Sequence, residues 1–257
     1  MRKILVSDYD YTLRDHNQPW ILGKNLAAIK QWRDKGNILA IATGRNLSSL
    51  AYIFPDYKDY ADYLLLNDGA EAYDNAGNII YSDELSDDNI AAIKELLKEA
   101  RFADNHTTVC YVNGIGLPHI HPKCNKIRIW FQSADDCNKT AALLRRDEYR
   151  DKFTITWHCN ITVNFDTREF SWVAPEMFNF LEITNAGIDK SVAISKVFTQ
   201  REDHIVTVGD DYNDIKMIQD YDGYVMAHAD RDIVRRFNSD RVVTSLYELI
   251  DILLAPA

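Results

Sequence analysis

Short apolar runs separated by helical segments recur along the first 66 residues and again near residue 204. They lie at residues 3–8, 37–42, 62–66 and 204–208, and they lack the alternation of apolar and polar positions typical of a half-exposed strand. Between the first two runs, apolar residues from Leu26 to Trp32 recur at helical spacing, and Gly36 follows them. Buried strands that alternate with helices are typical of a parallel sheet covered on both faces. Ligands of such sheets bind beyond the carboxyl ends of the strands.

The segment from about residue 83 to about residue 184 has a different pattern. Helices are predicted at 87–101 and 134–146, and strands at 107–112, 126–131, 153–157, 161–165 and 178–183. Strands that alternate with period two and have one apolar face predict an antiparallel sheet with helices on one side. We therefore expect an α/β protein whose Rossmann-like parallel-sheet core comprises residues 1–82 and 185–257. An inserted α+β domain is expected at 83–184.

Composition and charge exclude several classes of protein. The 257 residues are 46% hydrophobic and 26% charged, which is ordinary for a soluble globular protein and excludes a disordered chain. The formal net charge of −10 argues against a nucleic-acid partner, which would require clustered Lys and Arg. No apolar stretch approaches the roughly 18–20 residues that a membrane span needs. A nucleic-acid-binding protein and a membrane protein are therefore not expected.

The N-terminus and the cysteines indicate where the protein works. Only Ile4, Leu5 and Val6 separate the basic start from polar residues, so a removable secretion signal is not expected. The four cysteines share no C-x-x-C spacing and do not indicate a disulfide framework; they are Cys110, Cys124, Cys137 and Cys159. His119 and His121 near Cys124 leave a zinc site as an alternative to apolar packing of the cysteines. We expect a cytoplasmic protein.

Acidic residues follow two of the predicted strands. Asp8 and Asp10 stand two apart at the end of the first run, so their side chains point the same way. Two carboxylates at such a short distance repel each other unless a cation lies near them. Mg²⁺ is a suitable cation because it prefers oxygen ligands. Asp210 and Asp214 follow the last run and would supply further ligands. A solvated acidic surface is the competing interpretation.

Four segments stand out in chain order: DYDYTL (8–13), ATGR (42–45), GIDKSVAI (187–194) and GDDYND (209–214). Together they resemble the four motifs of the haloacid dehalogenase superfamily of aspartate-nucleophile phosphatases. The insert resembles the type II cap of that superfamily in its α+β (B) variety, and NDGA (67–70) and YVMA (224–227) resemble the Cof-type sugar-phosphatase branch. The resemblance implies hydrolysis of a small phosphomonoester, with sugar phosphates as the first class expected and Mg²⁺ as cofactor. A phosphotransferase or phosphomutase, and a phosphorylated-aspartate signalling switch, stay open as alternatives.

The resemblance also implies a role for each motif residue. Asp8 would attack phosphorus and carry the phosphoryl group. Asp10 would protonate the leaving oxygen and then activate water, with its pKa raised toward the working pH by burial and like charge. The phosphoryl oxygens would be held by Thr43, Gly44, Lys190 and Asn213. Mg²⁺ would be held by Asp8, the backbone carbonyl of Asp10, Asp210 and Asp214, the last as a ligand or as a support.

Two positions depart from the family pattern. Tyr11 stands where glycine is more usual, so the loop after the first strand is expected to be less flexible. His228 stands where an asparagine is usual, so any role of that asparagine in orienting the acidic loop must be filled differently or be absent. The main catalytic positions are unchanged, and we expect an active enzyme.

Overall fold

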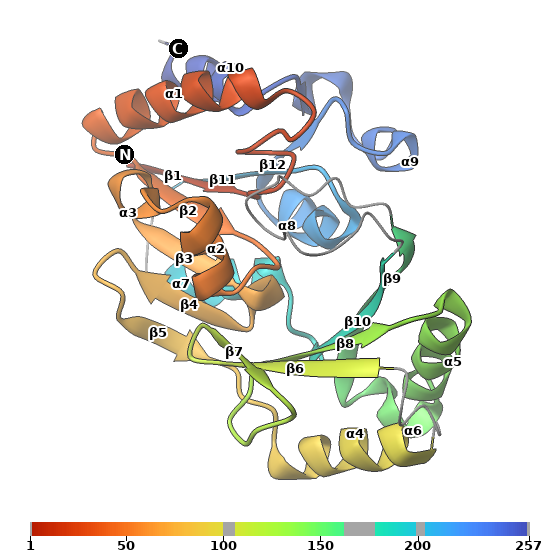
Figure 1. The fold of residues 1–257 in the computed structure, drawn as a ribbon. Helices are drawn as coiled ribbons and strands as arrows, with labels where there is room; N and C mark the ends of the chain where they lie inside the picture. Colours follow the sequence, from red (N-terminus) through yellow and green to blue (C-terminus); the bar gives the residue numbers. More distant parts are fainter. Residues whose placement is uncertain (1, 100–105, 162–177, 199–203, 256–257) are drawn as a thin grey trace. The chain divides into compact units, whose positions relative to one another are not determined.

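A computed structural model describes residues 2–99, 106–161, 178–198 and 204–255 (Figure 1). The chain divides into two compact units. The first unit comprises Met1–Arg45, Asp56–Tyr81 and Asp189–Ala257, and the second comprises Asn46–Pro55 and Ser82–Ile188. None of the helices in the described ranges has the length and apolar character needed to cross a membrane.

An eight-stranded sheet forms the centre of the first unit, in the order β13-β12-β11-β1-β2-β3-β4-β5. Its strands are β1 (Lys3–Ser7), β2 (Ile38–Ala42), β3 (Tyr63–Leu66), β4 (Glu71–Asp74), β5 (Ile79–Ser82), β11 (His204–Gly209), β12 (Asp222–Met226) and β13 (Val242–Val243). From β13 to β3 all neighbours pair in parallel, and β4 returns antiparallel to β3. The predicted parallel-sheet core is confirmed, and β4, β5, β12 and β13 extend it beyond the four strands expected.

Strand β1 lies where the direction of winding changes. The chain proceeds from β1 through β2 to β3 on one side, and β11, β12 and β13 later build the other side. In open α/β sheets, the crevice beyond the carboxyl ends of the strands at such a point is the usual ligand site. The residues that directly follow β1, β2 and β11 therefore lie where a ligand is expected.

Helices cover both faces of this sheet. They are α1 (Leu22–Asp34), α3 (Tyr57–Tyr60), α7 (Lys190–Phe198), α8 (Ile215–Asp220), α9 (Arg231–Val234) and α10 (Leu246–Leu254), with 3₁₀ turns at Pro19–Ile21, Asn67–Gly69, Tyr212–Asp214 and Ser239–Arg241. Helices α1 and α10 lie side by side (Figure 1), and Asn25 of α1 links them because its Oδ1 accepts the N–H of Tyr247. On the other face, Ile194 of α7 and Met217 of α8 pack in one apolar cluster with Val6 of β1. Buried apolar side chains on both faces explain why β1 has no polar alternation.

The second unit contains a five-stranded sheet in the order β7-β6-β8-β10-β9. Its strands are β6 (His106–Val112), β7 (Ile115–Pro118), β8 (Lys126–Phe131), β9 (Phe153–Ile161) and β10 (Phe178–Asn185); its helices are α2 (Leu47–Ile53), α4 (Asp87–Glu99), α5 (Ala134–Leu144) and α6 (Asp147–Arg150). Neighbouring strands pair antiparallel, as predicted. The expected strands at 153–157 and 161–165 are replaced by the single strand β9 as far as Ile161, and residues 162–165 lie outside the described ranges.

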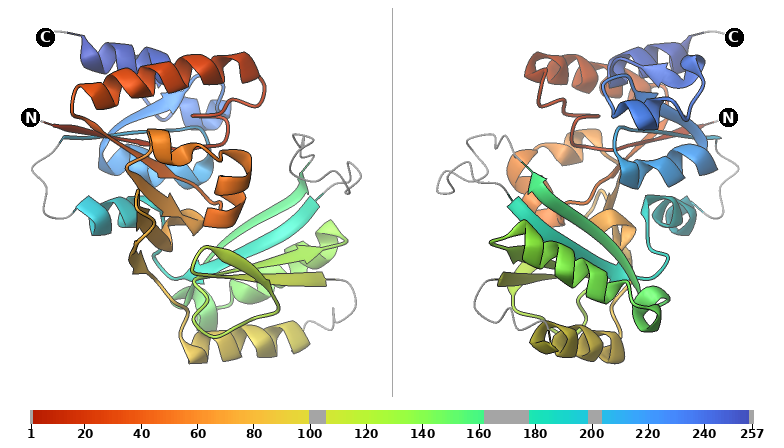
Figure 2. Two further views of the ribbon diagram at one scale, coloured as in Figure 1. Left: turned by 60° about the vertical axis from the view of Figure 1, so that its left-hand side comes forward. Right: turned by 90° about the vertical axis from the view of Figure 1, so that its right-hand side faces the viewer.

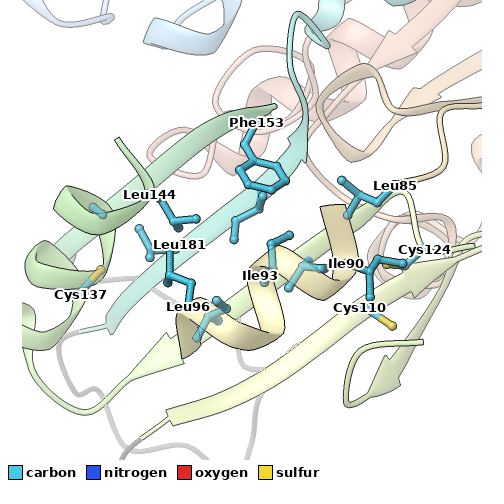
Figure 3. Close-up of a cluster of buried hydrophobic side chains, with 14 of the residues drawn as sticks. Leu85, Ile90, Ile93, Leu96, Cys110, Cys124, Cys137, Leu144, Phe153 and Leu181 are labelled. Carbon is cyan, nitrogen blue, oxygen red and sulfur yellow. The ribbon is translucent and has the colours of Figure 1, made fainter. Parts of the chain in front are cut away.

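One face of this sheet is apolar and packs against α4 and α5 (Figures 2 and 3). Ile93 and Leu96 from α4 and Leu144 from α5 meet Leu181 of β10 in this core. Cys110, Cys124 and Cys137 are buried in the same core as free thiols, and burial raises the pKa of Cys124 to about 12. Apolar packing is thus the role of these three cysteines, and the side chain of Cys159 lies outside the described residues.

A left-handed turn connects β3 to β4 in the first unit. Asn67, Asp68 and Gly69 have φ values of 53°, 57° and 96°, in the region that favours glycine. A Cβ atom on Gly69 would lie 2.2 Å from the carbonyl oxygen of Asp189, the residue before α7. This close approach fixes the turn against the start of the helix that carries Lys190.

Replacing Gly69 with alanine is expected to destabilise the first unit more than a positive φ alone explains. Gly77 is the matched control, because its φ is 92° and the nearest atom to an added Cβ is 3.9 Å away. Gly77→Ala should cost the roughly 1–2 kcal/mol of a left-handed residue. Gly69→Ala should cost that amount and about 2 kcal/mol more for overpacking. Urea unfolding measures both, and equal losses would contradict the proposed close contact.

Candidate active site

The carboxyl ends of β1, β2 and β11 bring together Asp8, Thr43 and Asp210. Ser7 of β1 pairs with Ile41 of β2 and with Val208 of β11, so the residues beyond these positions leave the sheet at the same edge. The N–H of Asp8 still donates to the carbonyl of Val208, at 3.0 Å. The predicted site residues from three distant motifs are therefore neighbours in one sheet.

Lys190, at the first turn of α7, lies between two buried carboxylates. Its Nζ is 2.6 Å from Oδ1 of Asp8 and 2.6 Å from Oδ1 of Asp214. Its side chain is 1% exposed, and those of Asp8 and Asp214 are 9% and 0% exposed. Burial alone would lower the pKa of Lys190, but the charges of Asp214 and Asp8 outweigh it and raise that pKa. Burial raises the pKa of Asp8 well above its ordinary value, against the opposing effect of Lys190.

The loop after β11 is organised by Asp214. Its Oδ2 accepts the N–H groups of Asp210 (3.0 Å) and Asp211 (3.1 Å), which turns the loop back on the carboxylate. A Cβ atom on Gly209 would lie 2.4 Å from Cγ of Asp214, so only glycine leaves room for this return. Thr12 donates to Oδ1 of Asp210 at 2.6 Å, while burial raises the pKa of Asp210 to about 7. Thr12 therefore links the loop after β1 to the loop after β11.

These residues fit a hard metal cation. Asp8, Asp210 and Asp214 each offer a carboxylate oxygen, and the three oxygens lie within 4.8 Å of one another. When all three carboxylates are ionised, the single ammonium of Lys190 offsets one charge and leaves a net charge of −2 in a largely buried place. A bound cation would offset this charge. An oxygen-only donor set favours Mg²⁺ or a similar cation over zinc. Over the described ranges, this is the single group of three or more His, Cys, Asp or Glu side chains with such geometry, so the zinc alternative finds no support there.

Asp10 does not join that group. Arg45 holds its carboxylate as a fork, with Nε 2.8 Å from Oδ2 and one terminal nitrogen 2.7 Å from Oδ1. His16 Nε2 lies 2.9 Å from Oδ1. Burial opposes ionisation, but the hydrogen bonds from His16 and Arg45 outweigh it and hold the pKa of Asp10 well below its ordinary value. The expectation of a raised pKa is wrong for this arrangement, because opposite charge and donors, rather than like charge, surround Asp10.

Thr43, Gly44 and Asn213 lie around Asp68. Thr43 is 1% exposed, and its carbonyl accepts the N–H of Asp68 at 3.2 Å. Asn213 Nδ2 donates to Oδ1 of Asp68 at 3.2 Å, and the same oxygen would lie 2.9 Å from a Cβ on Gly44. Asp68 thus connects the loop after β2 with the loop after β11. In the sequence, the NDGA segment was the only indication that Asp68 belongs to the site, and no role was expected for its side chain.

Tyr11 and His228, the two departures from the family pattern, both lie at the loop after β1. Tyr11 has φ 60°, so it occupies the left-handed conformation that glycine adopts without strain. Nδ1 of His228 lies 4.0 Å from Oδ2 of Asp15, whose Oδ1 accepts the N–H of Asn17 at 2.8 Å. His228 therefore stands beside the loop that follows β1. Arg45 and His16 are further residues of the site; Arg45 belongs to the ATGR segment, whereas no motif indicated His16.

Comparisons with known proteins show the family and the fold of this chain. A family model described as haloacid dehalogenase-like hydrolase matches residues 5–239. An uncharacterized protein of Mycoplasma capricolum is 27% identical over 91% of this chain and 94% of its own length. The 5-amino-6-(5-phospho-D-ribitylamino)uracil phosphatase of Bacillus subtilis is 26% identical over 91% and 86%, respectively. A solved structure of a subclass IIB sugar phosphatase is similar in fold, with a TM-score of 0.63 and 16% identity over 96% of this chain and 95% of that chain.

Removing the ammonium of Lys190 is expected to destabilise the first unit strongly. In Lys190→Met, Asp8 and Asp214 remain buried without their cation, which should lower the free energy of unfolding by about 3–5 kcal/mol at neutral pH. The deficit should shrink in acid, because a protonated carboxyl has no charge to bury. The matched control is Lys216→Met, which removes a cation 2.7 Å from Asp220 at an exposed position and should cost less than about 1 kcal/mol. Urea unfolding without metal measures both; equal losses would contradict the role of burial.

Proposed function

Because the chain belongs to the haloacid dehalogenase-like hydrolases, we propose that it hydrolyses a small phosphomonoester in a Mg²⁺-dependent reaction. The observation that carries the proposal is the Lys190 ammonium held 2.6 Å from both Asp8 and Asp214, where the ends of β1 and β11 meet. A buried carboxylate fixed by a cation beside further acidic groups is suited to nucleophilic attack on phosphorus. Asp8 is the proposed nucleophile and carrier of the phosphoryl group.

Each nearby side chain has a task in this reaction. Lys190 holds Asp8 through Oδ1, so Oδ2 is the attacking oxygen. Lys190, the hydroxyl of Thr43, the backbone N–H of Gly44 and the amide of Asn213 offset the charge on the phosphoryl oxygens. Asp8, Asp210 and Asp214, with the backbone carbonyl of Asp10, would hold Mg²⁺. Its positive charge would offset the repulsion between the Asp8 carboxylate and the negatively charged phosphoryl group.

Asp10 is the proposed acid and base. It gives a proton to the leaving oxygen as the P–O bond breaks, and it takes a proton from the water that later attacks the phosphoryl-aspartate. The contacts from Arg45 and His16 favour the ionised carboxylate, which is the form needed for the second step. For the first step, Asp10 must hold a proton, so the two-point contact with Arg45, which can only donate, has to weaken when substrate binds.

The substrate class proposed first is a sugar phosphate. Similarity in fold to a subclass IIB sugar phosphatase supports this class, and so does the relative whose substrate bears a phosphorylated ribityl chain. We place the catalytic core at residues 1–82 and 185–257, and a cap domain that selects the leaving group at 83–184. The expected partner is therefore a small phosphorylated metabolite met in the cytoplasm.

Release of inorganic phosphate from a panel of sugar phosphates, nucleotides and an aryl phosphate tests the proposal. We expect turnover that requires Mg²⁺, stops with EDTA and is lost in Asp8→Asn. Isomerised sugar phosphate without free phosphate would instead support a phosphomutase. A long-lived phosphorylated Asp8 without turnover would support a signalling switch. A folded protein that releases phosphate from no compound would overturn the phosphatase proposal.

Metal binding can be tested without turnover. Asp210→Asn should weaken Mg²⁺ binding by about 10–100-fold, because the neutral amide removes one negative charge from the three-carboxylate group. Asp211→Asn is the matched control, since the exposed Asp211 lies outside that group and asparagine keeps its cap on the N–H of Tyr212. Isothermal titration of the purified protein measures both affinities. A similar loss in the two variants would contradict the assignment of Asp210.

A further inference from the structure

The carboxylates of Asp8 and Asp10 belong to two separate sets of contacts. They stand two residues apart at the end of one strand, an arrangement that directs both toward the same cation. Asp8 instead lies with Lys190 and the other carboxylates of the candidate metal site, whereas Asp10 contacts Arg45 and His16. The two carboxylates thus have different partners, and each is held in its own position by them.

His16 reaches Asp10 because the chain reverses immediately after β1. Tyr11, in its left-handed conformation, donates its N–H to the carbonyl of Arg14 at 2.8 Å, and Arg14 donates to the carbonyl of Tyr9 at 2.8 Å. The rings of Tyr11 and His16 then lie 4.9 Å apart at 58°. His16 is 15% exposed on its side chain, so packing as well as the hydrogen bond restricts it.

The backbone that follows His16 is fixed independently. Oδ1 of Asp15 accepts the N–H of Asn17 at 2.8 Å and that of Gln18 at 3.3 Å, and Asp15 is 3% exposed. His16 therefore stands in a short loop held at both ends before it contacts Asp10. Because its backbone and its ring are already restricted, the His16 side chain loses little conformational freedom when it forms a hydrogen bond with Asp10.

We infer that His16 is a positioning residue that, with Arg45, directs the Asp10 carboxylate to the leaving group and keeps it out of the metal-binding set. This inference rests on the proposed function and adds to it a residue that neither the motifs nor the comparisons assign. Arg45 spans both oxygens of Asp10, and His16 adds a further contact to Oδ1. His16 itself gains and loses no proton in the reaction, since Asp10 gives a proton to the leaving oxygen in the first step and takes one from the attacking water in the second.

Dependence on the leaving group separates this role from a structural one. An alkyl phosphate needs a proton on its departing oxygen, whereas p-nitrophenyl phosphate releases a stable anion without one. His16→Ala should therefore lower kcat/KM for an alkyl sugar phosphate by about 10–100-fold and change kcat/KM for p-nitrophenyl phosphate little. His16→Gln, which keeps a hydrogen-bond donor, should recover part of the loss. The ratio kcat/KM is chosen because it excludes hydrolysis of the phosphoryl-aspartate, a step in which Asp10 also acts.

His204→Ala is the matched control, because Nε2 of His204 lies 2.8 Å from Oδ2 of Asp222 at the opposite end of β11 from Asp210. It should match the wild type with both substrates. Equal losses with both substrates in His16→Ala and His16→Gln, or no loss with either, would overturn the inference while an active wild type leaves the proposed function standing. A wild type inactive on both substrates would overturn the proposed function and this inference together. Thermal unfolding of each variant shows whether its fold is retained.

Discussion

The first unit depends on one buried ammonium shared between two carboxylates. Lys190, at the start of α7, joins Asp8 after β1 and Asp214 in the loop after β11, which are 182 and 24 residues away from it along the chain. An isolated ion of either sign would be costly in this interior, and the arrangement is tolerated because each carboxylate is paired with the same cation. The acidic loop, Asp8 and the first turn of α7 are consequently constrained as one group.

Two glycines, Gly209 and Gly69, are needed because the chain is closely packed around Lys190. Asp214 must turn back onto its own loop to reach Lys190, and Gly209 leaves the space for it. Gly69 allows the turn after β3 to approach the backbone of Asp189, directly before Lys190. The NDGA and GDDYND segments, which lie far apart in sequence, are therefore both parts of the enclosure around Lys190.

The sequence was sufficient for the central strands and for the residues at their ends. Asp8, Lys190 and Asp210 could be predicted because buried apolar runs and family motifs mark their positions. Short elements such as β13, and the hairpin of β4 and β5, carry too few residues for a pattern to be recognised. The contact of His16 with Asp10 could not be predicted either, because it depends on the turn at Tyr11, and a tyrosine in the left-handed region is not indicated by its residue type.

The position of β1 in the middle of its sheet has a consequence for the nascent chain. Lys3 and Ser7 pair with His204 and Val208, while the other side of β1 pairs with β2, which emerges from the ribosome much earlier. During synthesis, one edge of β1 consequently remains without its partner until β11 has been translated. Such an edge is prone to pair with other chains. A chaperone would therefore be most useful while the residues between β1 and β11 are being translated.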